Sequence, residues 1–216
     1  MDVDVEKEKR LAGEAAAAMV DSGMRVGLGT GSTVAYFLAA LAMRKLDLRC
    51  VATSTRTEQA ARQLGLSVEP FALDRLDIAV DGADQISPGG WLVKGGGGAH
   101  TREKLVAIAA DRFVVIGDST KPVEALHAPV PLELLVFGLE STLERLGEVR
   151  LRDCPRSPDG GVIADYIGPV GDPTLLAARL GSTPGVVEHG LFPPRMVTTI
   201  LVGRGESVDR IDLTTR

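Results

Sequence analysis

The stretch KGGGGAHTREK, residues 94–104, places four consecutive glycines between Lys94 and a run that contains Glu103. Glycine costs folding entropy, so a run of this length usually marks backbone that approaches a partner closely or adopts positive φ. A solvent-exposed linker is the alternative interpretation. A lysine and a carboxylate on either side of such backbone are typical of acid–base chemistry, in which one group moves a proton and another stabilises the resulting oxyanion.

Two more carboxylates stand close together in DGAD, residues 81–84. One alternative is a loop in which Asp81 and Asp84 bond their own backbone. A magnesium site is a second alternative. Lys94 would repel a cation, and no cluster of His or Asn accompanies the acids, so a metal is disfavoured. Asp81, Asp84, Lys94 and Glu103 together predict an acid–base site.

The stretch GLGTGST, residues 27–33, has the glycine content of a nucleotide-binding loop. It does not fit the dinucleotide pattern, because Ser32 replaces the third glycine and no acidic residue ends the following strand. It does not fit the Walker pattern either, because no lysine precedes the Ser-Thr pair. The remaining interpretations are an ordinary capped turn and a helix N-terminus that binds a lone phosphate, and we favour the phosphate.

The elements that must position these residues alternate between strand and helix. We predict strands within 25–29, 48–53, 77–84, 91–98 and 112–118, and helices at 4–22, from Ser32, at 55–65 and at 101–110. This rhythm indicates a parallel sheet covered on both faces. The polar stretches at 29–33, 53–57, 81–84, 94–103 and 117–121 each follow a predicted strand, where ligands of such sheets collect. The linker interpretation of the glycines is therefore weakened.

The rhythm changes after residue 127. The order strand, helix, strand, strand, helix, strand over 128–194 is typical of a ferredoxin-like α+β domain. SPDGG, residues 157–161, is typical of a hairpin turn between its two middle strands. A strand at 196–203 would rejoin the main sheet. The prediction is thus a Rossmann-like domain, residues 1–127 and 195–216, with an inserted small domain at 128–194.

Composition limits the classes of partner. The chain has 216 residues and a net charge of −5, which argues against nucleic acid or an anionic membrane and leaves a small anionic ligand possible. Cys50 and Cys154 suggest no disulfide framework, and Cys50 is expected to be buried. The three histidines lack metal-ligand spacing, and for His100 we favour a surface or capping role over contact with a substrate. Without a signal peptide or a long apolar run, the expected location is the cytoplasm.

These motifs, in this order, resemble the type A ribose-5-phosphate isomerases. The resemblance rests on GLGTGSTV, TSTRTEQA, DGADQI, KGGGGAHTREK, DSTK and PGVVEHGLF, and it is close over residues 1–121 and looser over the small domain. It implies a Rossmann-like domain with a ferredoxin-like insertion. It also implies interconversion of ribose 5-phosphate and ribulose 5-phosphate through an enediol in the pentose phosphate pathway, with no metal or organic cofactor.

The resemblance also implies a role for each matching residue. Glu103 would be the base that moves a proton between C2 and C1, and Lys94 would stabilise the oxyanion. Asp81 and Asp84 would hold the sugar hydroxyls, help to open the ring and shuttle the hydroxyl proton. The implied substrate-binding residues are Thr30, Gly31, Ser32, Thr33, Asp81, Gly82, Ala83, Asp84, Lys94, Gly95, Gly96, Gly97 and Lys121.

The chain departs from the family pattern at Gln85, where Glu is usual, and at His100, and neither change removes a proposed catalytic group. A CoA transferase or sugar-phosphate deaminase on a related fold is a rival enzyme, and a catalytically silent sugar-phosphate sensor is a rival of another class. The order of the DGAD, KGGG and TREK motifs disfavours the rival enzyme. The sensor is disfavoured because the acid–base set is complete and because about 25 residues before the first strand are too few for a DNA-binding helix-turn-helix. The resemblance suggests a homodimer or homotetramer.

Overall fold

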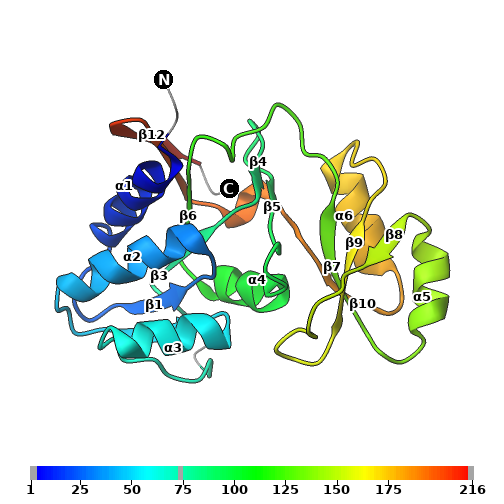
Figure 1. Ribbon diagram of the computed structural model, residues 1–216, viewed down its shortest axis with the longest axis horizontal. Coiled ribbons are helices and arrows are strands. Elements are labelled where there is room, and N and C mark those ends of the chain that lie inside the picture. Colours follow the sequence, from blue (N-terminus) through cyan, green and yellow to red (C-terminus); the bar gives the residue numbers. More distant parts are fainter. Residues whose placement is uncertain (1–3, 73–74, 214–216) are drawn as a thin grey trace. The chain divides into compact units, whose positions relative to one another are not determined.

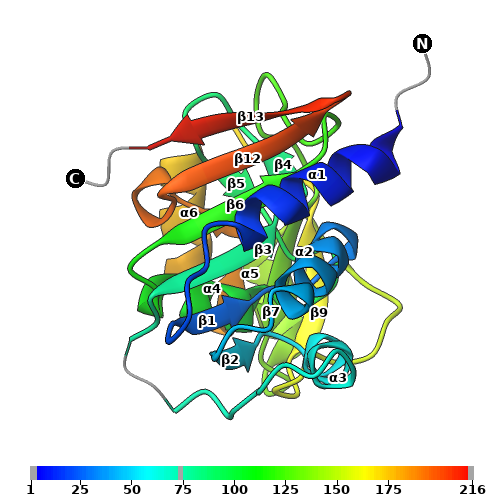
Figure 2. The same ribbon diagram turned by 90° about the vertical axis from the view of Figure 1, so that its left-hand side faces the viewer.

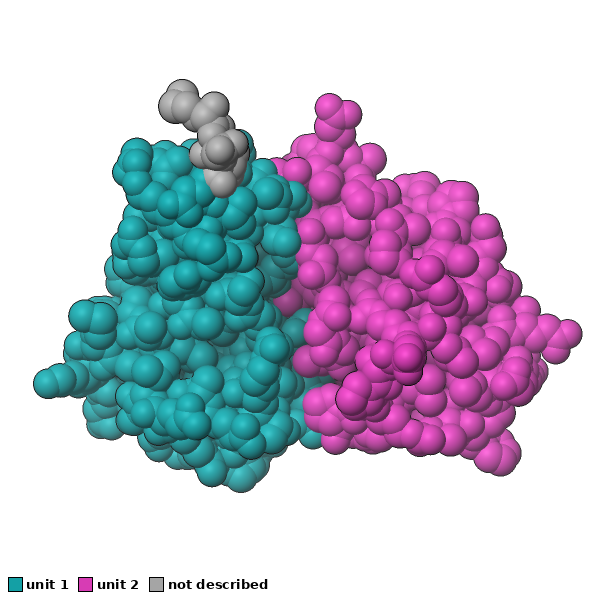
Figure 3. Space-filling model, viewed as in Figure 1, with its two compact units in different colours: residues 1–83, 102–121, 195–216 teal, residues 84–101, 122–194 magenta. Residues whose placement is uncertain are grey.

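The structure, a computed structural model, describes residues 4–72 and 75–213 (Figure 1). The remaining residues of the predicted larger domain, 1–3, 73–74 and 214–216, lie outside this part. The chain divides into two compact units (Figure 3). Unit 1 comprises residues 1–83, 102–121 and 195–216, and unit 2 comprises 84–101 and 122–194. Unit 2 thus includes residues 84–101 and 122–127, which the sequence-based division assigned to the larger domain.

Unit 1 is built on a six-stranded sheet with the order β13-β12-β6-β3-β1-β2 (Figure 2). Its strands are β1 (Arg25–Leu28), β2 (Arg49–Ala52), β3 (Ile78–Gly82), β6 (Phe113–Gly117), β12 (Thr199–Arg204) and β13 (Ser207–Asp212). All neighbouring pairs are parallel except β12 and β13. The mostly parallel sheet confirms the predicted fold class. The edge strand β13, which pairs with β12 in a hairpin, was not predicted.

Four helices accompany this sheet: α1 (Val5–Ala17), α2 (Ser32–Met43), α3 (Thr55–Gln63) and α4 (His100–Ala109). In Figure 2, α1 and α2 lie in front of the sheet. Their buried residues pack with one side of the strands in a cluster that includes Val34, Phe37, Val80 and Ile116. The opposite face is covered by α4, since a Cβ added at Gly27 of β1 would lie 2.4 Å from Cγ1 of Val106. Coverage on both faces explains why the central strands β3 and β6 are almost continuously buried.

Cys50 of β2 is fully buried in the same cluster, as expected from the sequence. Burial raises the pKa of its thiol to about 12, with a smaller contribution from the charge of Glu69. Cys154 is exposed, and both cysteines are free. Cys50 therefore acts as a small apolar core residue.

Unit 2 contains a four-stranded antiparallel sheet with the order β10-β7-β9-β8. Its elements along the chain are β7 (Val130–Leu134), α5 (Leu139–Leu146), β8 (Val149–Leu151), β9 (Val162–Tyr166), α6 (Pro173–Ser182) and β10 (Val186–His189). This order of elements and strands confirms the ferredoxin-like pattern. The predicted turn at 157–161 forms within the longer connection of β8 to β9, where the N–H of Ser157 donates to the carbonyl of Gly161 over 2.9 Å.

A second, three-stranded sheet of unit 2 joins β4 (Gln85–Ile86), β5 (Leu92–Val93) and β11 (Leu191–Phe192) in antiparallel order. Two predictions are corrected here. The strand before the glycine run was expected in the parallel sheet, but it is the short β5. VVEHGLF was expected as one strand, but Gly190 separates β10 from β11. A Cβ at Gly190 would lie 2.1 Å from the carbonyl oxygen of Lys94, so backbone approaches backbone at this position.

A short 3-10 helix, Pro194–Met196, leads from β11 to β12. No helix in the described ranges 4–72 and 75–213 is long and apolar enough to cross a membrane.

Candidate active site

The order of the parallel strands in unit 1 locates a switch point between β1 and β3. The chain passes from β1 to β2 on one side, and β3, β6 and β12 follow on the other side. In doubly wound sheets with this order, ligands bind at the carboxyl ends of the strands beside the switch point. The stretch Thr30–Thr33 follows β1 and leads into the first turn of α2, and Asp81 and Gly82 end β3. The two predicted stretches therefore lie next to each other.

Asp81 ties the two loops of the switch point together. Its Oδ1 accepts hydrogen bonds from the N–H of Thr30 over 2.9 Å and from the N–H of Gly82 over 2.7 Å. A Cβ at Gly29 would lie 2.1 Å from the Asp81 Cγ, so this contact requires glycine. Asp81 is 3% exposed. The interpretation in which an aspartate bonds nearby backbone is therefore correct for one oxygen of Asp81.

Glu103 lies in the first turn of α4 and is buried. It precedes Val106 by one helical turn, and residues at this spacing share a helix face. Val106 contacts the sheet beside Ala79, and Asp81 follows Ala79 by two positions on the same face of β3. Glu103 and Asp81 are thus presented on the same side of the sheet in unit 1.

A cluster of hydroxyl groups fixes the loop after β1. The Thr30 Oγ1 is 2.9 Å from Thr53 Oγ1, 2.8 Å from Ser54 Oγ and 3.1 Å from Thr57 Oγ1. Thr57 also donates to the carbonyl of Gly29 over 2.9 Å. TSTRT, which the sequence placed at a strand end without a role, therefore supports the predicted ligand loop. Both the N–H and the hydroxyl of Thr30 are used in this support.

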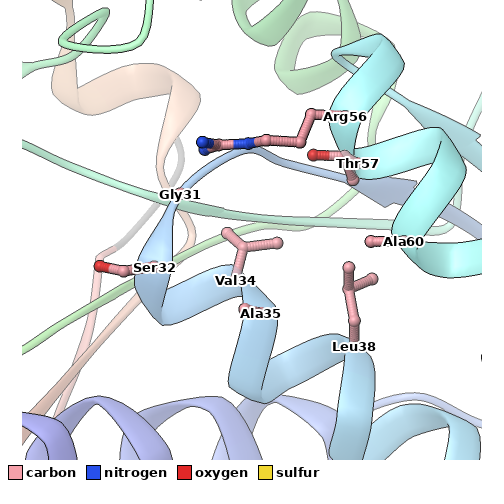
Figure 4. Close-up of a pocket in the computed structure, with 8 residues that line it drawn as sticks. All are labelled: Gly31, Ser32, Val34, Ala35, Leu38, Arg56, Thr57 and Ala60. Carbon is pink, nitrogen blue, oxygen red and sulfur yellow. The ribbon is translucent and has the colours of Figure 1, made fainter.

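The N-terminus of α2 is capped by Gly31, which has no side chain to accept hydrogen bonds from the first turn. A pocket of about 350 Å³ opens beside it and is lined by Gly31, Ser32, Val34, Ala35, Leu38, Arg56, Thr57 and Ala60. Figure 4 shows the side chain of Arg56 extending from α3 towards Gly31. The side chain of Arg56 forms no hydrogen bond or ion pair with any residue that the structure describes. Sequence reasoning overlooked this cation, although it stands inside TSTRT.

The glycine loop of unit 2 is held on several sides. The N–H of Lys94 donates to the carbonyl of Gly190 over 2.8 Å, and the N–H of Gly96 donates to Asp84 Oδ2 over 2.8 Å. Lys94 is 2% exposed, and its Nζ lies 5.5 Å from the ring centroid of Phe192, at the distance of a cation–π contact. Asp84 is exposed. Unit 2 therefore brings Asp84, Lys94 and Gly96 together.

His100, expected at the surface or as a cap, is fully buried at the start of α4. Its ring packs against Gly95, where an added Cβ would lie 2.6 Å from Nδ1. Gly95 also has a φ of 104°, which side chains rarely adopt. The prediction of a surface position for His100 is wrong, because the compact glycine loop folds over the ring.

Two further polar side chains of unit 2, Glu133 and Gln85, hold neighbouring segments of the chain together by hydrogen bonds. Glu133 of β7 is buried and accepts hydrogen bonds from the hydroxyls of Thr101 and Ser157. The Gln85 amide donates to the carbonyl of His127 over 2.8 Å, while its oxygen accepts from the N–H of His127 over 2.9 Å. Sequence reasoning assigned no role to Glu133, although a carboxylate in an apolar strand signals a buried interaction.

The predicted site residues fall into two groups. Unit 1 carries Thr30–Thr33, Asp81–Ala83, Glu103 and Lys121, whose N–H donates to the carbonyl of Asp118 over 3.1 Å. Unit 2 carries Asp84 and Lys94–Gly97. Among residues 4–72 and 75–213, no group of three or more His, Cys, Asp or Glu side chains is arranged to hold a metal.

The fold and the loops at the switch point are typical of the α/β proteins that bind a small ligand at the carboxyl edge of a parallel sheet. The family model described as ribose 5-phosphate isomerase A (phosphoriboisomerase A) matches residues 49–207. The chain belongs to this family. It is an isomerase of the pentose phosphate pathway, and it interconverts ribose 5-phosphate and ribulose 5-phosphate.

Relatives and solved structures agree with this assignment. Ribose-5-phosphate isomerase A of Caulobacter sp. (strain K31) is 48% identical over 208 residues, covering 88% of this chain and 91% of the relative. The protein of that name from Caulobacter vibrioides (strain NA1000 / CB15N) is 47% identical over 228 residues, covering 97% and 99%. The structure of ribose 5-phosphate isomerase A from Methanocaldococcus jannaschii has a TM-score of 0.90 at 32% identity, covering 96% and 99%.

A further solved structure, a D-ribose-5-phosphate isomerase in complex with phospho-erythronic acid, has a TM-score of 0.91 at 32% identity. The match covers 97% of this chain and 99% of the chain in that structure.

Proposed function

We propose that the isomerisation proceeds through an enediolate, with Glu103 as the base. Glu103 would remove the proton from C2 of the open-chain aldose and return it to C1, while the hydroxyl proton moves from O2 to O1. A base positioned beside the carbon contributes about 10²–10⁴-fold to the rate. The burial of Glu103, on the same side of the sheet as Asp81, supports this role.

We assign stabilisation of the enediolate oxygen to Lys94. A buried ammonium interacts more strongly with a developing oxyanion than an exposed one, because water screens it less. The loop backbone is fixed through Gly190 and Asp84, so the position of Lys94 is largely set before the substrate arrives. Asp81 and Asp84 would hold the sugar hydroxyls, assist ring opening and carry the proton between O1 and O2.

We assign the phosphate to the N-terminus of α2. The N–H groups of Ser32 and Thr33 lie in its first turn, where the helix dipole favours an anion. Arg56 at the adjoining pocket and Lys121 would supply positive charge. Gly82, Ala83, Gly95, Gly96 and Gly97 would contribute backbone contacts to the sugar.

The phospho-erythronic acid in the related structure has a planar, negatively charged carboxylate beside a hydroxyl-bearing carbon, which resembles an enediolate. We expect the same compound to bind this chain and to compete with ribose 5-phosphate. Glu103→Gln should lower kcat at least 100-fold while retaining affinity for phospho-erythronic acid, measured by calorimetry.

The matched control is Glu140→Gln, which changes an exposed first-turn glutamate of α5 and should keep the wild-type rate. A Glu103→Gln variant that turns over ribose 5-phosphate near the wild-type rate would show that another group is the base. Exchange of the C2 proton with deuterium oxide, followed by NMR, reports the same step directly and should be lost in the variant.

We also propose that the protein is a homodimer or homotetramer in the cytoplasm. The consecutive side chains of Leu135, Val136 and Phe137 in unit 2 are 50%, 47% and 93% exposed, an apolar run that association would cover. The substrate, a charged sugar phosphate, does not cross a membrane unaided, which favours a cytoplasmic enzyme. Sedimentation equilibrium would test the assembly, and a monomer at micromolar concentration would overturn it.

A further inference from the structure

Arg152 contacts the glycine loop and a buried carboxylate at the same time, all within unit 2. Its Nε and Nη2 donate to Asp165 Oδ2 and Oδ1 over 2.8 and 2.6 Å. Its Nη1 donates to the carbonyl oxygens of Gly95 and Gly96 over 2.9 and 3.0 Å. The side chains of Arg152 and Asp165 are only 19% and 8% exposed.

An arginine suits this position better than any other residue. Its planar guanidinium offers donors on two edges, so one edge binds the carboxylate in two places while the other binds two carbonyls. We call this set of contacts, from Arg152 to Asp165 and to the carbonyls of Gly95 and Gly96, the clamp. Asp165 lies on β9, which is paired with a strand on each side, so the clamp has a rigid base. The hydrogen bond from Arg152 to Asp165 raises the pKa of the guanidinium, so it stays charged throughout the working pH range.

The clamp fixes one peptide plane from both ends. The carbonyl of Gly95 and the N–H of Gly96 belong to the same planar peptide group and point in opposite directions. Arg152 binds that carbonyl, and Asp84 binds that N–H over 2.8 Å. Arg152 therefore sets the orientation of this peptide, and the peptide in turn holds the Asp84 carboxylate. Lys94 is bonded to Gly95, the first residue of this peptide group.

We propose that Arg152 is a positioning residue for the isomerisation, acting through the Gly95–Gly96 peptide on Asp84 and Lys94. This inference rests on the roles proposed above for those two residues. A positively charged donor on the Gly95 carbonyl also polarises the peptide and makes its N–H a stronger donor to Asp84. Glycines give this loop the space for close contact, and Arg152 removes the freedom that glycines would otherwise leave.

The test compares Arg152→Gln with Arg150→Gln. Arg150 is exposed and lies two positions earlier, on β8, and its side chain forms no hydrogen bond or ion pair within the described part of the chain. Misplacing catalytic groups by about 1 Å costs about 100-fold in rate. We therefore expect Arg152→Gln to lower kcat by about 10- to 100-fold while KM changes less than about threefold, and Arg150→Gln to keep both constants.

The conservative variant separates position from charge. Arg152→Lys keeps the positive charge, but one ammonium cannot bind Asp165 at two points and both carbonyls as well. Arg152→Lys should therefore lose at least about fivefold in kcat. It also serves as the decisive variant if Arg152→Gln does not fold. A wild-type kcat for whichever of the two variants folds would overturn the proposal.

Two further measurements exclude a general structural role. Hydrogen exchange of peptide 94–101, followed by mass spectrometry, should become faster in Arg152→Gln while exchange in β9 is unchanged. Equal acceleration in both segments would overturn the proposal. In the Lys94→Gln background, Arg152→Gln should lower kcat much less than in the wild type, because both changes remove the same contribution.

This double-mutant cycle of Lys94→Gln and Arg152→Gln also separates the role of Arg152 from the proposed function on which it rests. A Lys94→Gln variant with wild-type kcat would overturn the assigned role of Lys94, whatever Arg152 does. A large loss in Lys94→Gln combined with none in Arg152→Gln would overturn the role of Arg152 alone.

Discussion

Thr30 donates its backbone N–H to the Asp81 carboxylate over 2.9 Å, so a proposed catalytic acid also determines the shape of the ligand loop after β1. The contact joins two strand ends at the switch point of the sheet. It gives Asp81 a structural and a chemical role, and substitutions that keep or remove the hydrogen-bond acceptor distinguish the two.

Asp81→Asn and Asp81→Ala should therefore differ. The amide oxygen of Asn can still accept from Thr30 and Gly82, so Asp81→Asn should unfold in urea within about 1 kcal/mol of the wild type. Its kcat should fall about tenfold or more, because the charge is gone. Asp81→Ala leaves buried N–H groups without an acceptor, which costs about 1–3 kcal/mol in addition. Equal stability of the two variants would contradict the structural role.

Gly29→Ala should damage the same contact from the opposite side. The added Cβ would lie 2.1 Å from the Asp81 Cγ, so the carboxylate must shift. We expect a loss of about 1–3 kcal/mol in unfolding free energy and a lower kcat. Gly89→Ala is the control, since nothing lies within 4 Å of its added Cβ, and it should unfold within about 0.5 kcal/mol of the wild type.

Gln85→Glu introduces the glutamate that the family resemblance implies at this position, and it should destabilise this chain at neutral pH. The Gln85 amide donates to the carbonyl of His127, and an ionised carboxylate cannot, which costs about 1–3 kcal/mol. Burial beside a carbonyl would raise the pKa of the introduced carboxyl. The deficit should therefore shrink at acidic pH, where the carboxyl is protonated and can donate. Urea unfolding of both proteins from pH 4 to 8 tests this, and a constant deficit would contradict it.

Glu8 of α1 should contribute to stability in a pH-dependent manner. Its carboxylate accepts from the N–H of Ser119 over 2.9 Å and from the N–H of Gly205 over 2.8 Å. Burial raises the pKa of Glu8, but these hydrogen bonds and the charge of Arg204 outweigh burial and hold the pKa below its usual value. The contribution of ionised Glu8 to the free energy of unfolding is complete above the unfolded-state pKa of about 4.3. It is lost as the pH falls through the lower folded-state pKa.

Glu8→Gln keeps one acceptor and removes the charge. The substitution should lower the free energy of unfolding by about 1–2 kcal/mol at pH 7. The difference should become progressively smaller below pH 4, because Glu8 of the wild type also becomes protonated there. Unfolding free energies at these two pH values provide the measurement. A deficit that grows on acidification would show that the sign of the pKa shift is wrong.

The parallel sheet and the ferredoxin-like pattern could be predicted because apolar runs and turn residues repeat along the chain. The loop after β1 and the DGAD loop were located for the same reason, since each follows a short and largely apolar strand. The strand before the glycines was misplaced because Leu92 and Val93 are apolar in either type of sheet, and local sequence does not specify the partner strand.

Residues that act by long-range contact were missed. Arg152 touches Gly95 and Gly96 across more than fifty positions of sequence, and no local pattern relates the two segments. The burial of His100 is of the same kind, because it depends on how the glycine loop folds over the ring. Only the placement of Asp165 and Glu133, charged residues in otherwise apolar strands, offered a signal.

One of the four chain boundaries between the two compact units falls inside α4, between Thr101 and Arg102, and another falls between Ala83 and Asp84, so each unit contains two of the four residues proposed for the chemistry. Neither piece, produced separately, would possess a complete set. A gene fusion that exchanged unit 2 for that of a relative would replace Asp84 and Lys94 together with their supporting clamp, yet keep Asp81 and Glu103. Exchange of both segments of unit 2, residues 84–101 and 122–194, between family members would therefore vary the proposed oxyanion-stabilising part of the enzyme independently of its proposed base.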